Sequence, residues 1–275
     1  DCYGLPIEIE VEKKIKKGEE LSDKDFRKLC REYALNQVER QKKDFKRLGV
    51  LGDWENPYLT SNKKFEASTL KALEKIYNNG HLQKGFKPVH WCVKIQSALA
   101  EAEVEYQEKE SIAIDVKFEV TSLDEVKRIF AINDMDKKVF VVIWTTTPWT
   151  LPSNKSIAVK SDLNYILVSN NKEIYIIAES LFEKFKERTN LELSILARCS
   201  GENLINLEAN HPFLDNKINI ISSDHVTDDS GTGCVHIAPA HGIEDFELGK
   251  KHNLEVVNPI QSDGIFSGLP ESSVT

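Results

Sequence analysis

The first part of the chain carries two stretches of helical periodicity. Apolar residues recur every three or four positions over 21–48, and Ser22 precedes them as an N-cap with Asp25 three residues later. A second amphipathic stretch covers 65–79 and ends at Gly80. The pattern therefore predicts two helices, one over 21–48 and one over 65–79.

Strand periodicity begins at Val89 and continues to the end of the chain. Segment 114–120 alternates apolar and polar residues, and 139–147 is a continuous β-branched run of the kind buried on both faces of a sheet. Asn170 and Asn171 predict a hairpin turn. The further predicted strands are 89–95, 103–109, 156–160, 165–170, 173–178, 218–226 and 233–238, and the further predicted helices are 179–189 and 243–252. Because both hairpins and helices connect the strands, we expect a mixed α+β sheet domain that is closed or barrel-like.

Composition narrows the class of protein without identifying it. The 275 residues, 40% apolar and 29% charged, allow one large globular domain or two modest ones. No apolar run approaches the roughly 20 residues that span a bilayer. Five scattered cysteines without a CxxC pair indicate a reducing, cytoplasmic compartment rather than a disulfide framework or a structural zinc site. The start, which has neither Met nor a signal peptide, reads as the interior of a longer chain.

The net charge of -8 gives no support to non-specific binding of nucleic acid. Local basic stretches occur over 40–47 and at Lys63 and Lys64, and a solvated helix face explains each of them more simply. Charge therefore leaves a nucleic-acid partner open without predicting one.

Three consecutive threonines end the buried strand predicted over 139–147. Side chains alternate faces along a strand, so Thr145 and Thr147 should point one way and Thr146 the other. The turn that follows contains two prolines, which fix the chain and remove backbone donors. This arrangement offers hydroxyls and free amides at the mouth of a pocket, although on spacing alone a simple strand end is the more economical interpretation.

The segment over 231–254 begins with Gly-Thr-Gly, which permits close approach of the backbone. His236 lies in the next strand. Asp245 lies in the first turn of the next helix, where backbone N–H groups can hold a carboxylate and keep it ionised. Such a carboxylate can receive an ammonium group. Taken singly, His236 is more simply a core histidine and Asp245 a complement to the helix dipole.

Three common chemistries lack their sequence patterns. His236 and His241 are separated by a proline turn and have no cysteine or carboxylate nearby at zinc-ligand spacing, so no metal site is expected. No G-x-S-x-G elbow is present for a serine hydrolase. A phosphate-binding GxxxxGK[ST] loop is missing as well.

The two segments occur together and in an order that resembles a known family. WTTTPWTLPSN and GTGCVHIAPAHGIEDF resemble the threonine-rich and GTG…HxAPxHGxxD motifs of the editing domain in the synthetases for isoleucine, valine and leucine. DCYGLPIE resembles the DCHGLPIE element of isoleucyl-tRNA synthetases, with Tyr3 in place of the usual His. KPVHWC and SALAEAEVEY also resemble the bacterial isoleucyl enzymes. On these motifs the chain is identified as a member of the bacterial-type isoleucyl-tRNA synthetases over essentially its whole length.

In that family an editing domain is inserted into a Rossmann-type catalytic domain. The resemblance implies a partial class I catalytic segment over 1–60, a helix and strand connector over 61–111, and a β-barrel-like editing domain over 112–275 that is truncated at its C-terminal end. The ATP-binding signatures HIGH and KMSKS are missing from this sequence. Synthesis with ATP and Mg²⁺ is therefore expected of the full-length enzyme and not of this piece. Cys92 lacks the second cysteine that many relatives have, so no zinc is expected there.

The resemblance also implies roles for individual residues. Asp245 is expected to bind the α-ammonium of misplaced valine, and His236 to line the side-chain pocket and exclude isoleucine. The threonines are expected to contact the ester, the terminal adenosine or the attacking water, and Trp149 to be a packing residue. The expected catalytic residues are Thr145, Thr146, Thr147, His236 and Asp245, and the expected substrate-binding residues are Asn154 and Asp1.

The implied reaction is the hydrolysis of Val-tRNA(Ile) by water, without a cofactor. The expected partners are the 3′ end of tRNA(Ile), isoleucine and valine, and the expected protein is a cytoplasmic monomer without membrane contact. Two alternatives stay open. One is the editing domain of a valyl or leucyl enzyme, against which DCYGLPIE argues, and the other is a tRNA-binding fragment without activity.

Overall fold

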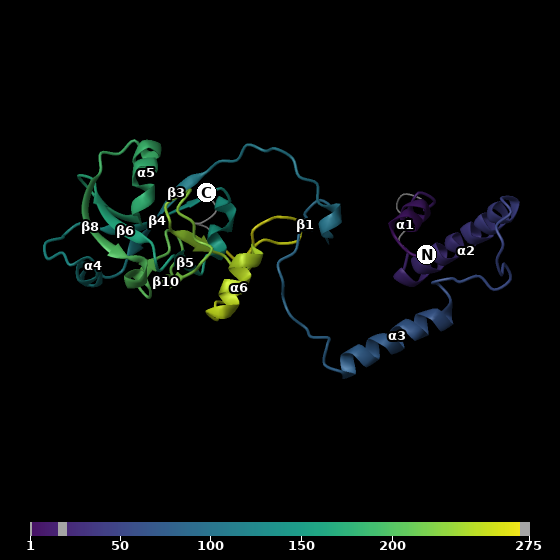
Figure 1. The fold of residues 1–275 in the computed structure, drawn as a ribbon. Coiled ribbons are helices and arrows are strands. Elements are labelled where there is room, and N and C mark those ends of the chain that lie inside the picture. The colour runs from purple at the N-terminus through teal and green to yellow at the C-terminus, as the bar shows by residue number, and fades with distance from the viewer. Residues whose placement is uncertain (1, 16–20, 270–275) are drawn as a thin grey trace. The chain divides into compact units, whose positions relative to one another are not determined.

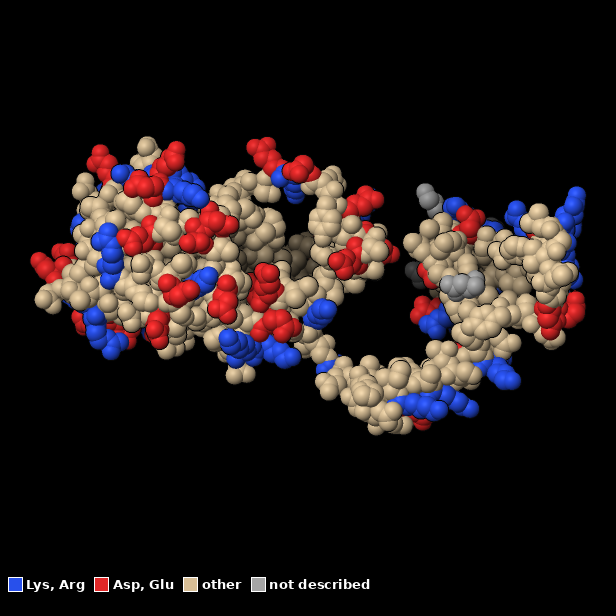
Figure 2. Space-filling model, in the orientation of Figure 1, with Lys and Arg blue, Asp and Glu red and all other residues tan. Residues whose placement is uncertain are grey.

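The computed structural model describes residues 2–15 and 21–269, and its contacts divide the chain into two units (Figure 1). Unit 1 is Asp1–Gly85 and unit 2 is Phe86–Thr275. Acidic and basic side chains are interspersed over the visible face of unit 2 (Figure 2). Within the described ranges, no helix is both long enough and apolar enough to cross a membrane.

The described part of unit 1 contains the helices α1 (Leu5–Glu12), α2 (Asp23–Arg47) and α3 (Lys63–Asn78). α2 confirms the helix predicted over 21–48. Ser22 Oγ accepts a hydrogen bond from the backbone N–H of Asp25, as expected of an N-cap. α1 has no counterpart among the predicted elements, and it packs against α2.

α3 confirms the second predicted helix but begins at Lys63 instead of 65. The reason is a cap, because Asn62 Oδ1 accepts a hydrogen bond from the backbone N–H of Lys64. No residue of α3 is buried. Its apolar face is therefore exposed in this structure, including Leu70 and Tyr77.

Nine strands of unit 2 form one mixed sheet in the order β11-β5-β10-β9-β3-β4-β7-β6-β8. The pairs β10–β5 and β4–β7 are parallel and the other pairs are antiparallel. This arrangement confirms the mixed α+β prediction. The strands are β3 (Ile114–Val120), β4 (Val139–Thr145), β5 (Ser156–Val159), β6 (Asn164–Ser169), β7 (Ile174–Ala178), β8 (Ser194–Ser200), β9 (Glu208–Asn210), β10 (Lys217–Ser222) and β11 (Val235–Ile237).

The sheet curls strongly but does not close into the expected barrel. Its edge strands, β11 and β8, do not pair with each other within the described residues. β11 instead lies against β4, which is five places away in the sheet order. β11 has only three residues and Pro239 follows it without an N–H, so few backbone groups remain for a closing ladder.

Other parts of unit 2 depart from the predicted elements. The strand predicted over 89–95 is reduced to β1 (Trp91–Cys92), which pairs with β2 (Ser97–Ala98). The strand predicted over 103–109 is wrong, because this segment pairs with no neighbouring strand. An alternating pattern becomes a strand only where another backbone completes its hydrogen bonds.

The helices of unit 2 are mostly short. The predicted helix over 179–189 divides into η3 and α5, and α6 confirms the one over 243–252. α4, β8 and β9 have no predicted counterpart. The helices are η1 (Glu101–Glu103), α4 (Leu123–Phe130), η2 (Pro148–Ser153), η3 (Glu179–Leu181), α5 (Phe182–Thr189), η4 (Gly201–Leu204) and α6 (Ile243–Lys251).

The hairpin turn predicted at Asn170 joins β6 to β7. Asn170 Oδ1 accepts hydrogen bonds from the backbone N–H groups of Lys172 at 2.8 Å and Glu173 at 2.6 Å. The side chain therefore replaces the backbone partners that the turn lacks, which is why Asn favours this position.

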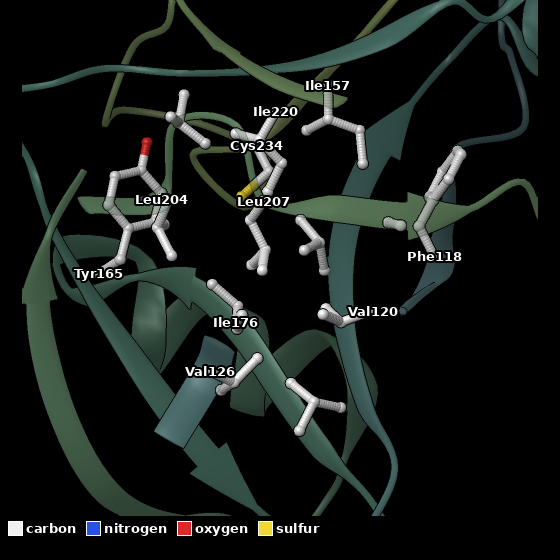
Figure 3. Close-up of a cluster of buried hydrophobic side chains, with 14 of the residues drawn as sticks. Phe118, Val120, Val126, Ile157, Tyr165, Ile176, Leu204, Leu207, Ile220 and Cys234 are labelled. Atoms are coloured by element: carbon white, nitrogen blue, oxygen red, sulfur yellow. The ribbon is translucent and has the colours of Figure 1, made fainter. Parts of the chain in front are cut away.

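The main hydrophobic core is shared by the strands of the curled sheet (Figure 3), with Phe118, Ile157 and Ile176 among its fully buried members. A second cluster on the opposite face of β4, β6 and β7 packs under α5. β4 is thus buried on both faces, as its β-branched run predicts. Tyr165 connects the core to the Gly-Thr-Gly loop, because its hydroxyl donates to Gly233 O at 2.6 Å.

Three histidines hold the short helix η2 in place. They come from three separate places: the end of β9, β11, and the loop before α6. The contacts are His211 Nε2 to Leu151 O (3.0 Å), His236 Nε2 to Thr150 Oγ1 (3.0 Å) and His241 Nε2 to Ser153 Oγ (2.8 Å). Burial lowers the pKa of all three imidazoles, and that of His236 falls to about 4.

Gly231 and Gly233 provide a matched test of how the Gly-Thr-Gly loop packs. Their φ angles are 75° and 73°, so an alanine at either position costs about 1–2 kcal/mol in backbone strain. A Cβ on Gly233 would lie 2.3 Å from Ala178 Cβ, whereas one on Gly231 would meet Trp144 at an ordinary 3.5 Å. We expect Gly231→Ala to lower the free energy of unfolding by about 1–2 kcal/mol and Gly233→Ala by about 3 kcal/mol or more.

Urea unfolding followed by hydrogen exchange of β4 and β7 measures both losses within unit 2. Equal losses in the two variants would contradict the close packing of Gly233 on β7.

The histidine contacts also predict a pH dependence of stability. The pKa of His236 is about 4 in the folded chain and near 6.5 when unfolded, so the unfolded state binds more protons in that interval. Stability should therefore be complete above pH 6.5 and fall as the pH drops toward 4. At about 1.4 kcal/mol per pKa unit, the loss from His236 is about 3 kcal/mol. Chemical denaturation at several pH values measures this slope. His236→Gln should flatten it, and an unchanged slope would show that His236 is not held in its neutral form.

Candidate functional site

The five residues predicted to be catalytic meet at one end of the curled sheet. The end of β4, the Gly-Thr-Gly loop, β11 and the start of α6 line a cavity of about 320 Å³. The residues that line this cavity include Thr145, Thr146, Thr147, His236 and Asp245. Two segments far apart in the sequence thus share one cavity, because the curl of the sheet brings β11 against β4.

The threonines form an ordered corner of this cavity. Thr145, the last residue of β4, is buried, and its Oγ1 accepts a hydrogen bond from the backbone N–H of Thr147 at 3.0 Å. The Oγ1 atoms of Thr145 and Thr147 are 3.2 Å apart. Thr146 is exposed between them. β4 ends at Thr145 and not at 147 as predicted, so the corner is formed by the turn after the strand, and all three threonines line the one cavity.

Asp245 reaches the cavity from the first turn of α6. Its Oδ2 accepts a hydrogen bond from the backbone N–H of Ala238 at 2.8 Å. Burial raises the pKa of Asp245, and the bond from Ala238 offsets this only in part. The expectation that the helix N–H groups hold the carboxylate ionised is thus corrected: the donor comes from the preceding loop, and desolvation is the larger effect.

The Asp245 carboxylate forms no ion pair in the described parts of the chain. A half-buried carboxylate without a cation is costly, and a cation that enters the cavity relieves that cost. The cavity therefore favours a ligand that carries a positive charge.

His236 is a largely buried residue of the cavity lining. It is the middle residue of β11, where it pairs with Ile157 of β5, and 8% of its surface is exposed. Its Nε2 lies 3.0 Å from Thr150 Oγ1, and its Nδ1 is buried without a hydrogen-bond partner in the described structure. With a pKa near 4, the ring is neutral at physiological pH and adds no charge to the cavity.

Two further predicted residues lie outside the cavity lining. Asn154 is fully buried, and its Nδ2 donates to Ser156 O at 2.9 Å while its Oδ1 lacks a partner among the described residues. Trp149 is 51% exposed, so it does not have the buried packing role expected of it.

Asp1, the other residue expected to bind substrate, lies outside the described residues. The residues that follow it, Cys2 to Gly4, line a separate hollow of about 790 Å³ within unit 1, together with Arg31 and Glu66. Arg31 and Glu66 form an ion pair at 2.9 Å across that hollow.

His225 lines the main cavity and is not among the predicted site residues. It falls within the strand predicted over 218–226, but β10 ends at Ser222 and the loop that follows contributes His225 to the lining. Its Nδ1 lies 2.7 Å from Ser223 Oγ, and its Nε2 is buried without a partner in the described structure. A histidine six positions before Gly231 of the Gly-Thr-Gly loop was the available signal for this residue.

The cavity combines one carboxylate with several hydroxyls and the neutral imidazole of His236. In the described ranges, no three His, Cys, Asp or Glu side chains are grouped so that they could hold a metal ion. The arrangement can bind an ammonium group at Asp245 and can orient a water molecule or an ester through the threonine hydroxyls and backbone amides.

Known proteins are similar to this chain in sequence and, over about half of its length, in structure. The chain is 54% identical over 269 residues to the isoleucine–tRNA ligases of Francisella tularensis subsp. novicida (strain U112) and subsp. holarctica (strain FTNF002-00 / FTA). Each alignment covers 97% of this chain and 29% of the relative, so the chain spans less than a third of the length of these curated proteins. The editing domain of the P. knowlesi cytosolic leucyl-tRNA synthetase is a similar solved structure, with 16% identity, a TM-score of 0.45, and coverage of 51% of this chain and 62% of that one.

The family comparison covers most of the chain. Residues 1–212 match the family described as tRNA synthetases class I (I, L, M and V). The protein therefore belongs to the class I tRNA synthetases of the I, L, M and V group.

Proposed function

We propose that unit 2 hydrolyses misacylated tRNA, with Val-tRNA(Ile) as its substrate. The observation that carries this proposal is the Asp245 carboxylate, which lacks an ion pair in the described chain and shares one cavity with the threonine corner and a neutral histidine. An aminoacyl ester brings an α-ammonium group next to a carbonyl carbon, and these are the two features for which the cavity has partners.

The need for such a reaction follows from a limit on recognition. A pocket shaped for isoleucine rejects valine only weakly, because one methylene is worth about 1–3 kcal/mol, a limit for which isoleucyl enzymes are the standard example. A second, smaller cavity that hydrolyses valyl esters and excludes isoleucyl esters restores accuracy.

In the proposed mechanism Asp245 binds the α-ammonium and so fixes the ester in one orientation. The hydroxyls of Thr145 and Thr147 and nearby backbone amides hold the attacking water or the carbonyl oxygen, and Thr146 contacts the terminal adenosine. His236 lines the space for the amino-acid side chain and limits its size. A ribose hydroxyl of the tRNA can assist the water, so no covalent intermediate with the enzyme is required. Asn154 would bind substrate only if the cavity opened toward it.

The remaining segments are assigned by the same family resemblance. We propose that 1–60, including Asp1, belongs to the synthetic domain, that 61–111 connects it to the insertion, and that 112–275 is the editing domain. The full-length enzyme would charge tRNA(Ile) with isoleucine at the expense of ATP, with Mg²⁺, as a monomer in the cytoplasm. This chain would contribute the editing step.

Two alternatives differ from the main proposal in substrate or in activity. An editing domain of a valyl or leucyl enzyme would use the same cavity on another aminoacyl-tRNA, and the 54% identity to isoleucine–tRNA ligases favours the isoleucyl assignment. A tRNA-binding fragment without activity would not explain the Asp245 carboxylate, which has no ion pair in the described chain.

Asp245→Ala tests the ammonium site. Loss of a buried charge-assisted contact costs about 3 kcal/mol or more, so kcat/KM for deacylation of Val-tRNA(Ile) should fall at least about 100-fold. Glu244→Ala is the matched control, since Glu244 is the neighbouring acid in the same turn and is exposed. The deacylation assay uses the protein in the full length of its relatives, with hydrogen exchange to verify that α6 stays folded. Equal activity in Asp245→Ala and the parent protein would refute the assignment.

A comparison of two substrates tests the isoleucyl assignment. The same protein should deacylate Val-tRNA(Ile) faster than Thr-tRNA(Val). An isoleucyl enzyme recognises the body of tRNA(Ile), and its editing pocket is matched to the side chain of valine. Initial rates at equal substrate concentrations give the ratio. A ratio in favour of Thr-tRNA(Val) would move the chain to the valyl enzymes.

A further inference from the structure

Thr150 is a buried hydroxyl beneath the cavity, and the mechanism above gives it no role. It belongs to η2 and is 6% exposed. Its Oγ1 lies 2.8 Å from Thr147 O, to which it donates, and 3.0 Å from His236 Nε2. One hydroxyl thus touches the threonine corner on one side and the cavity histidine on the other.

The protons in this contact can be counted. A hydroxyl has a single proton, and the contact with Thr147 O uses it, because a carbonyl oxygen can only accept. Toward His236, Thr150 Oγ1 can therefore act only as an acceptor, so the imidazole must donate from Nε2–H. The opposite assignment, with the hydroxyl donating to Nε2, makes one hydrogen bond fewer. Because the ring is neutral, it carries no second proton, and Nδ1 is then a bare lone pair.

The surroundings of Nδ1 favour the same tautomer. This atom is buried and has no hydrogen-bond partner in the described structure. A buried N–H donor without an acceptor is rarer in proteins than an acceptor without a donor. Thr150 is not part of the cavity lining, whereas His236 is. Nε2 therefore contacts a residue outside the cavity lining, and Nδ1 is the ring nitrogen that has no partner in the described structure.

We propose that Thr150 is a positioning residue that holds His236 as the Nε2–H tautomer, so that Nδ1 accepts a hydrogen bond from an O–H donor at the ester. This proposal rests on the proposed deacylase function. The donor is either the attacking water or a ribose hydroxyl of the tRNA end, since both present an O–H group to an acceptor. Nδ1 is buried in this structure, so the donor reaches it only when the bound ester displaces the groups that cover it.

The tautomer can be observed without any assay of activity. In the ¹⁵N spectrum of the chain labelled at histidine, His236 should show a protonated Nε2 and an unprotonated Nδ1, with His236→Gln identifying the signals. Thr150→Val, which keeps the shape but removes the hydroxyl, should shift the ring toward the Nδ1–H form or a mixture of both. Thr150→Ser should restore the parent spectrum. A protonated Nδ1 in the parent chain would overturn the proposal.

The deacylation rates supply the second readout. Thr150→Val should lower kcat for Val-tRNA(Ile) about tenfold, the effect of one misdirected hydrogen bond, with little change in KM, and Thr150→Ser should recover it. Thr189→Val is the matched control, because Thr189 Oγ1 also donates to a backbone carbonyl, that of Phe185 at 2.7 Å, but it lies on α5 and outside the cavity lining. It should leave both the spectrum and the rate unchanged.

The two readouts separate the possible outcomes. Full activity in Thr150→Val, or lost activity with an unchanged tautomer, would overturn the positioning role. If the parent protein leaves Val-tRNA(Ile) intact, the proposed function fails, while the spectrum still decides the tautomer. A substrate whose terminal adenosine lacks the free ribose hydroxyl identifies the donor. An equal loss from Thr150→Val on both substrates indicates water, and a loss that disappears on the modified substrate indicates the hydroxyl.

Discussion

The approach of β11 to β4 across the curled sheet is the constraint on which the rest of unit 2 depends. Among the described strands β11 pairs in the sheet with β5 alone, yet it lies against a strand five places away in the sheet order. This single approach places His236 beside the end of β4 and brings the first turn of α6, which carries Asp245, to the same cavity. A flat sheet with the same strand order would separate the two groups, and neither motif would form a cavity by itself.

The parts of the fold that follow from local patterns could be predicted, and the parts that depend on distant partners could not. β4 follows from its unbroken β-branched run, and α2 from its periodicity and the Ser22 cap. α4 carried a readable signal, with Ser122 as its cap and Val126 and Phe130 one turn apart, and was missed. Segment 103–109 alternates like a strand but has no neighbour, and β9 is too short for any pattern. Closure of the sheet depends on edge geometry, which no local pattern records.

The candidate site divides in the same way. Thr145, His236 and Asp245 could be found because their motifs are long and occur in a fixed order. His225 was hidden inside a predicted strand, since only the end of β10 at Ser222 frees it to reach the cavity. The desolvation of Asp245 is also invisible in sequence, because it depends on what surrounds the first turn of α6 and not on the turn itself. The sequence is thus enough to select the candidate site residues, whereas the protonation state of each one depends on its burial in the folded chain.

The three histidines that hold η2 have a consequence for the order in which the cavity arises during synthesis. Their partners in η2 precede them by 60, 86 and 88 positions. When the ribosome releases η2 and the threonines, none of these imidazoles exists yet, and Asp245 appears last. A nascent chain can pair β4 with β3 while it grows, but the lining of the candidate cavity is incomplete until β11 and α6 have emerged. The candidate site of unit 2 is therefore complete only once α6 has been synthesised, and a stop before α6 yields a sheet without that site.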